Sequence, residues 1–166
     1  MAGPGTWKLF TRAKRLMGTG GAAMTAGGVT LGVGVYKIAL HKKSASANLL
    51  KTSNGGISTW ASIGSEIVAQ GGYAAAGRNI GPVTGKWTVD GTSTAKMKFT
   101  FTTSGIKFTA NAANLSAIKY AVLRTSSGAG VGKAVCFCTL SSTTFSISSG
   151  NILQILPATG GIFSLK

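Results

Sequence analysis

Short apolar runs separated by turn-forming residues dominate the second half of the chain. Two such runs, at residues 118–123 and 134–140, flank a loop of small residues at 124–133. Each run is rich in β-branched and aromatic residues and is too short for a typical helix. We therefore predict two neighbouring antiparallel strands at the centre of a sheet, buried on both faces.

Residues 96–102 alternate strictly between apolar and polar side chains. Met97, Phe99 and Phe101 would point to one side, with Lys96 and Lys98 on the other. This alternation is typical of a half-buried antiparallel strand whose solvent face, here, is basic.

The remaining pattern extends the β prediction to most of the chain. Further strands are expected at residues 35–40, 83–89, 106–110, 144–148, 152–156 and 162–165. Turn signals recur roughly every eight to twelve residues, as in a β-sandwich or barrel. We predict a mainly β protein whose residues 35–166 form one antiparallel β-sandwich of jelly-roll or immunoglobulin-like type. A short helix capped by Ser58 is expected to interrupt it and to run through Trp60 to Ile67.

The first 34 residues are expected to form a short helix and a glycine-rich arm. Thr6 can cap a helix over residues 7–17. One face of that helix would carry Trp7, Phe10, Ala13 and Met17. The basic residues off this stripe are Lys8, Arg12 and Arg15, with Lys14 at its border. Such a helix could dock on a membrane or nucleic acid, or pack on its own domain or a neighbouring subunit; its narrow stripe favours packing.

Residues 16–36 contain no charged side chain, and a segment of this length could cross a bilayer as a helix. Their many glycines and scattered apolar positions argue against a spanning helix and against a secretory signal. We interpret residues 18–34 as a flexible arm and expect no membrane role.

The charge balance is strongly basic. Seventeen Lys and Arg face only two acids, Glu66 and Asp90, which gives a formal net charge of +15. This charge could serve to bind a polyanion, or only to keep a chain rich in small polar residues soluble; self-repulsion on this scale favours the polyanion.

The same scarcity of acids argues against an enzyme. Acid–base pairs, acidic cation sites and Asp-oriented histidines all need carboxylates, and the single histidine is His41. Cys136 and Cys138 would point to one face of a strand, where we interpret them as small core residues. We expect no catalytic residue, no metal, no cofactor and no small-molecule substrate.

The sequence also lacks a complete phosphate-binding loop and the common nucleic-acid-binding motifs. Residues 127–134 resemble a phosphate loop, but Ser127 replaces its first glycine and Ala134 its magnesium-binding hydroxyl. No helix-turn-helix, RNA-recognition or zinc-finger pattern occurs, so any contact with nucleic acid would involve the backbone alone and depend on salt.

A series of short motifs resembles a known group of proteins when taken in order. The motifs are residues 7–14 (Trp-Lys-Leu-Phe-Thr-Arg-Ala-Lys), 36–40 (Tyr-Lys-Ile-Ala-Leu), 58–68, 71–77 (Gly-Gly-Tyr-Ala-Ala-Ala-Gly), 118–123 (Ile-Lys-Tyr-Ala-Val-Leu) and 161–165 (Gly-Ile-Phe-Ser-Leu). Their order is similar to that in small structural proteins of tailed bacteriophages, which have no catalytic residues. The glycine-rich segment 18–34 and the high basic charge depart from that group.

The resemblance implies a non-enzymatic virion protein, assembled in the host cytoplasm and bound to the head as a decoration protein or as the base of a head appendage. Its partners would be major capsid or neck proteins; a homo-oligomer such as a trimer and non-specific DNA contact are compatible with this role. The contact residues we expect are Trp7, Phe10, Arg12, Lys14, Arg15, Lys96 and Lys98, with Lys107 and Lys119 extending the basic face. The alternatives are a tail, neck or connector component and a free basic nucleic-acid-binding protein.

Overall fold

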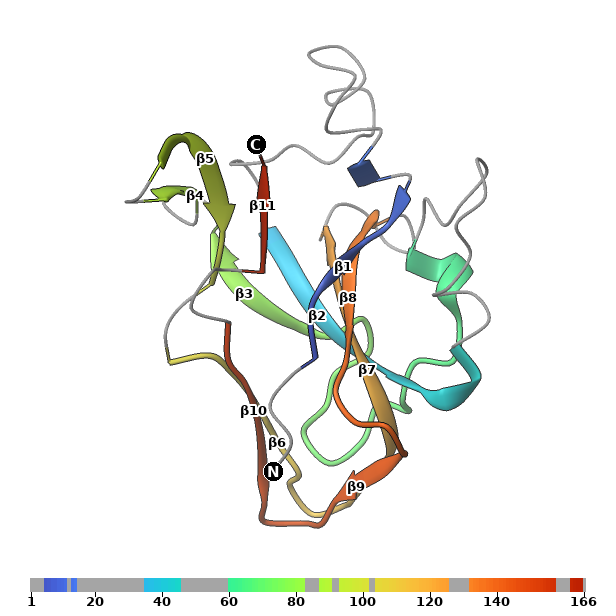
Figure 1. Cartoon of the computed structure of the whole chain (residues 1–166). Helices are drawn as coiled ribbons and strands as arrows, with labels where there is room; N and C mark the ends of the chain where they lie inside the picture. The colour runs from blue at the N-terminus through green and yellow to red at the C-terminus, as the bar shows by residue number, and fades with distance from the viewer. Residues whose placement is uncertain are drawn as a thin grey trace.

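A computed structural model describes residues 5–11, 13–14, 35–45, 60–82, 87–90, 93–101, 104–125, 132–157 and 162–165. This part of the chain is mainly β (Figure 1). Its strands are β1 (Lys8–Leu9), β2 (Val35–Lys42), β3 (Arg78–Pro82), β4 (Trp87–Asp90), β5 (Ser93–Phe99), β6 (Ile106–Thr109), β7 (Leu115–Thr125), β8 (Ala134–Thr139), β9 (Phe145–Ile147), β10 (Ile152–Ile155) and β11 (Phe163–Leu165). Two 3₁₀ turns, η1 (Lys43–Ala45) and η2 (Trp60–Ile63), complete the named elements.

The strands form three antiparallel sheets. The main sheet has the order β1-β8-β7-β2-β3, and β9 also pairs with β7. The second sheet pairs β10 with β6, and the third has the order β11-β5-β4. The predicted antiparallel, mainly β fold is thus confirmed, whereas the jelly-roll or immunoglobulin-like sandwich remains a prediction.

Strand β7 lies at the centre of the main sheet, as its apolar sequence predicts. Its Leu123 is paired with Cys136 of β8 on one side and with Ile38 of β2 on the other. Strand β7 begins three residues earlier than predicted and extends two residues further, so that Arg124 belongs to the strand and not to the loop.

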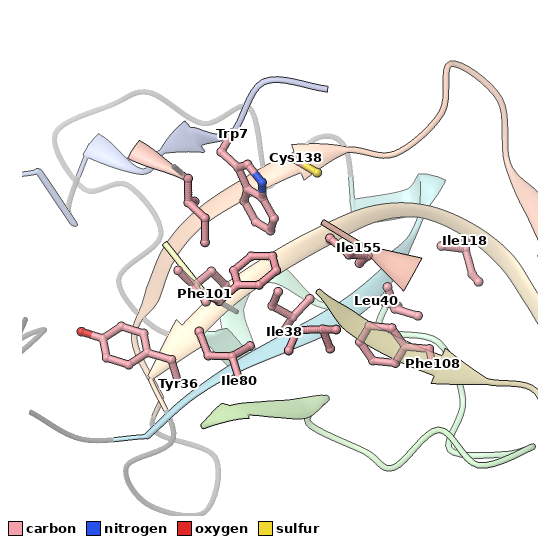
Figure 2. Packing of buried hydrophobic residues seen from close by; sticks show 14 of the residues in the cluster. Trp7, Tyr36, Ile38, Leu40, Ile80, Phe101, Phe108, Ile118, Cys138 and Ile155 are labelled. Atoms are coloured by element: carbon pink, nitrogen blue, oxygen red, sulfur yellow. The ribbon is translucent and has the colours of Figure 1, made fainter. Parts of the chain in front are cut away.

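Both faces of the β7–β8 pair are covered by apolar side chains. One face belongs to the main core, which the main sheet shares with strands of the two smaller sheets. Figure 2 shows part of that core, including Trp7, Ile38, Leu40, Phe101, Phe108, Ile118 and Ile155. On the opposite face, Tyr120 and Val122 pack with Phe137, Phe10 and Ile63 in a second cluster. Phe99 and Phe101 are buried, as their alternation with lysines predicts.

The N-terminal helix prediction is wrong for residues 7–10. Lys8 and Leu9 form β1, and the amide of Phe10 donates to the Val135 carbonyl at 3.1 Å. The extended backbone puts Trp7 in the main core and Phe10 in the second cluster, whereas a helix would have placed both on one face. Pairing with the edge of β8 therefore outweighs the helical spacing.

A helical turn begins only after β1, so Thr6 does not cap a helix starting at Trp7. Thr11, Ala13 and Lys14 are helical, and the Lys14 amide donates to the Phe10 carbonyl at 3.0 Å. Arg12 and residues 15–34, which include Met17 and the predicted arm, lie outside the described residues. None of the described helical segments is both long and apolar enough to cross a membrane.

The second predicted helix, after Ser58, is also wrong. Only the 3₁₀ turn η2 forms, and Gly64 and Ser65 follow it with φ angles of 65° and 53°. This left-handed backbone ends the turn, after which the amide of Ile67 donates to the Leu40 carbonyl at 3.0 Å. Of the strand predicted at 83–89, residues 83–86 lie outside the described residues, and β4 covers the remainder.

Candidate anion-binding groove

A groove lies where β3 faces β6. It consists of two adjoining hollows, of about 370 and about 420 Å³, which share Arg78, Asn79 and Lys107. The first is completed by Lys37, Phe108 and residues 72–74 and 77, and the second by Ile80 and residues 104–106. We call this feature the β3–β6 groove.

Cations, and no acid, are found among the described residues that line the β3–β6 groove. Arg78 and Lys107 are exposed and Lys37 is half-buried, and neither hollow is lined by an Asp or Glu. The Arg78 guanidinium donates to the Lys107 carbonyl and so connects the two strands. Three cations around a narrow hollow produce a positive potential that suits an anionic ligand.

The wall formed by residues 72–77 is held by hydrogen bonds that are buried or partly buried. The Tyr73 hydroxyl donates to Glu66 Oε1 at 2.5 Å and accepts from the Leu40 amide at 3.0 Å. Arg124 Nε donates to the Ala76 carbonyl at 3.0 Å. Side chains from distant parts of the sequence thus fix this wall before any ligand binds.

These side chains belong to a larger group, His41, Trp60, Glu66, Tyr73 and Arg124, which we call the polar cluster. The Arg124 guanidinium lies 4.3 Å from the centre of the Trp60 ring, a cation–π geometry. Burial raises the pKa of Glu66 despite the Tyr73 hydrogen bond and the Arg124 charge. Burial, together with Glu66, also raises the pKa of Tyr73.

His41 is the most deeply buried titratable group of the polar cluster, at 1% exposure. Its Nδ1 lies 2.8 Å from the Gly64 carbonyl. Because a carbonyl only accepts, Nδ1 carries the proton. Burial lowers the pKa of His41 to about 4, and the nearby Arg124 charge contributes in the same direction.

We expect the protein to lose stability when the pH falls from about 6.5 to about 4. In this window the unfolded chain binds a proton at His41 and the folded chain does not, so protonation favours unfolding by up to about 3 kcal/mol; above pH 6.5 the effect vanishes. Because His41 is the single histidine, its imidazole NMR signals give the folded-state pKa directly. A midpoint near 6.5 would contradict the prediction.

Gly77 is the point at which the groove wall touches β2. Its φ angle is 81°, and an added Cβ would overlap the Ile38 carbonyl and lie 2.8 Å from the Cα of Ala39. Gly150 has a similar φ angle of 88° but open space around it.

We expect Gly77→Ala to destabilise the protein by about 1–3 kcal/mol more than Gly150→Ala, because both substitutions carry left-handed strain but only the first adds a clash. Denaturant unfolding of the two variants measures this difference. Equal losses would show that Gly77 is needed only for its backbone conformation.

Of the contact residues predicted from the sequence, the structure describes the side chains of Trp7, Phe10 and Lys14. Trp7 and Phe10 are buried at 7% and 3% exposure, so in this fold their side chains are covered by their own chain. Lys14 is exposed, and Arg12 and Arg15 lie outside the described residues. Lys96 and Lys98 belong to β5, and the positions of their side chains are not described.

The groove residues were mostly missed by the sequence interpretation. Lys107 was expected to extend a basic face, but Lys37 and Arg78 carried no signal of their own. Arg78 directly follows the glycine-rich motif at residues 71–77. That motif therefore lies beside the groove, although the sequence alone does not show that a groove forms there.

The described residues offer little chemistry of other kinds. They contain no group of three or more His, Cys, Asp or Glu residues placed to hold a metal ion. Cys136 and Cys138 are buried free thiols, and burial raises the pKa of both, that of Cys138 to about 12. Of the segment that resembles a phosphate loop, residues 127–131 lie outside the described part, and Lys133 leads directly into β8.

The chain was compared with protein-family models, curated proteins and solved structures, and none of the three comparisons gave a match.

Proposed function

We propose that the chain is a non-enzymatic structural protein of a tailed-bacteriophage virion, bound to the head as a decoration protein or as the base of a head appendage. The observation that carries this proposal is the order of motifs, which resembles that of small phage structural proteins. In the fold, three of these motifs lie in β2, in the turn 71–77 and in β7, which contact one another. These three motifs are therefore neighbours in this fold.

The fold supports a role as a docking module. Antiparallel sheets around a shared core are rigid, and weak contacts made by each copy add up when a particle presents the same site many times. A net charge of +15 suits an acidic shell or packaged DNA as the surface that the protein meets.

Antibody labelling of intact, DNA-filled particles, viewed by electron microscopy, tests the proposal. Label spread over the head would establish decoration. Label at one vertex or along the tail would support the alternative role as a neck, connector or tail component. Label only after the particles are opened would place the protein against DNA, and no label in either state would refute the virion proposal.

The second alternative, a free nucleic-acid-binding protein, is favoured only by the charge. It predicts an affinity for DNA that falls by orders of magnitude between about 50 and 200 mM salt. A protein docked on a lattice through mixed polar and apolar contacts should depend less on salt.

A further inference from the structure

We propose that the β3–β6 groove binds an extended acidic segment of a partner protein. This inference rests on the proposed function and names the chemistry of the docking contact. It follows from the charge, the shape and the rigidity of the groove.

The charge of the groove favours an anionic partner. Lys37, Arg78 and Lys107 line it, and no carboxylate among its lining residues neutralises them. Arg78 presents a planar guanidinium, which matches the geometry of a carboxylate. Glu66, the nearest described acid along this wall, is already bonded to Tyr73.

The shape of the groove suits an extended peptide. Strand β3 is the last strand in the path of the main sheet, and β6 has its sheet partner, β10, on its other side. The contact with Arg78 shows that the Lys107 carbonyl faces β3 and not β10. The groove therefore runs between two strand edges, where a peptide backbone can add its own hydrogen bonds.

The same features disfavour duplex DNA as the occupant. The two hollows, of about 370 and 420 Å³, have the volume of small-ligand sites. Even a single DNA-binding module needs a different shape, an open surface of several hundred square ångströms. Two aromatic residues, Tyr73 and Phe108, contribute to the lining, with ring centroids 5.8 Å apart. Each is 4% exposed, so the lining offers only a small apolar surface beside its cations. Such a lining fits acidic side chains that alternate with small apolar ones.

The wall is also fixed in advance. Tyr73 and Ala76 are held by Glu66 and Arg124, so binding does not have to order this segment. A peptide that matches the groove would therefore lose less affinity to ordering than one that binds a mobile loop.

The test measures the anisotropy of a fluorescein-labelled peptide of alternating Glu and Val residues, titrated with the full chain at physiological salt. We expect Lys37→Gln/Lys107→Gln to weaken binding about tenfold, equivalent to 1.4 kcal/mol. The matched control is Lys8→Gln/Lys42→Gln, which removes the same charge from one exposed and one half-buried lysine outside the groove. It should change the affinity by less than about twofold.

Three results would overturn the proposal: no binding of the peptide, equal weakening by both double variants, or tighter groove-dependent binding of a DNA duplex. Protection of Cys136 and Cys138 from a thiol reagent confirms that each variant is folded. Particle labelling is independent of these results. If the protein is found in particles but does not bind the peptide, only the groove assignment is wrong. If it binds the peptide through the groove but is absent from particles, only the virion role is wrong.

Discussion

Replacing Trp7 with alanine is expected to lower the free energy of unfolding by about 3–5 kcal/mol. The indole is 7% exposed and lies in the main core, and β1, which follows it directly, is an edge strand of only two residues. Loss of the indole would leave a large cavity and remove one apolar anchor of this segment; the Phe10 ring, packed against Phe137 of β8, is another. Chemical denaturation, or the rate at which a thiol reagent modifies the buried Cys136 and Cys138, measures the loss.

The choice of controls separates packing from hydrogen bonding. The Trp7 Nε1 is buried and has no hydrogen-bond partner among the described residues, so Trp7→Phe keeps much of the apolar contact and removes this unsatisfied donor. We expect it to cost clearly less than Trp7→Ala. Lys8→Ala, at an exposed neighbour, should change stability by less than about 0.5 kcal/mol. A Trp7→Ala variant as stable as Lys8→Ala would show that β1 is dispensable.

This expectation changes the truncation experiment that the sequence suggests. If residues 1–34 were only a contact arm, their deletion would block particle incorporation and leave the remaining domain folded. Because Trp7 and Phe10 are buried in two different clusters, that deletion would also damage the fold. Charge reversal at the exposed Lys14 tests an N-terminal contact without this complication.

The second large effect is expected at Arg124. Arg124→Met should cost about 2–4 kcal/mol, because it removes the donor to the Ala76 carbonyl and leaves the half-buried Glu66 without a stabilising charge. Arg124 as a residue is 3% exposed, so water has little access to the space that its side chain fills. Thermal and chemical unfolding measure the cost, and the same variant should weaken peptide binding by releasing the groove wall.

A double-mutant cycle with Glu66→Gln identifies the cause. If the cost comes from the unpaired carboxylate, Glu66→Gln should recover a large part of the stability lost in Arg124→Met. Additive losses would show instead that Arg124 acts through Ala76 and Trp60, without coupling to Glu66.

The centre of the fold is predictable because its signal is local. The runs at 118–123 and 134–140 are apolar without alternation, and the structure gives the reason: Tyr120 and Val122 pack on one side of β7 while Ala121 and Leu123 pack on the other. Likewise, Phe99 alternates with lysines and is buried.

The N-terminal segment could not be predicted in the same way. Trp7 and Phe10 are three residues apart, a spacing that suits one face of a helix but also the two sides of a short strand. The free edge of β8, more than a hundred residues away in the sequence, decides between them. Local pattern contains no information about that edge.

The polar cluster was hidden for a related reason. Glu66 was considered as an isolated acid and Arg124 as a loop residue, yet Glu66 bonds Tyr73 and Arg124 acts electrostatically on both. Sequence shows the residue types, but the contact depends on the crossover that places β2 between β7 and β3.

That crossover affects how the chain is made. Strand β2 leaves the ribosome before β3, and its other neighbour, β7, is synthesised only after β3, β4, β5 and β6. During this interval the apolar stretch that includes Ile38, Ala39 and Leu40 has no β7 edge to join. The main sheet can close only when its latest strands are available, so folding should be slow for a chain of this size. At high expression levels, slower translation or added chaperones should therefore raise the yield of folded protein. This increase should be larger than the stability of the finished protein alone would predict.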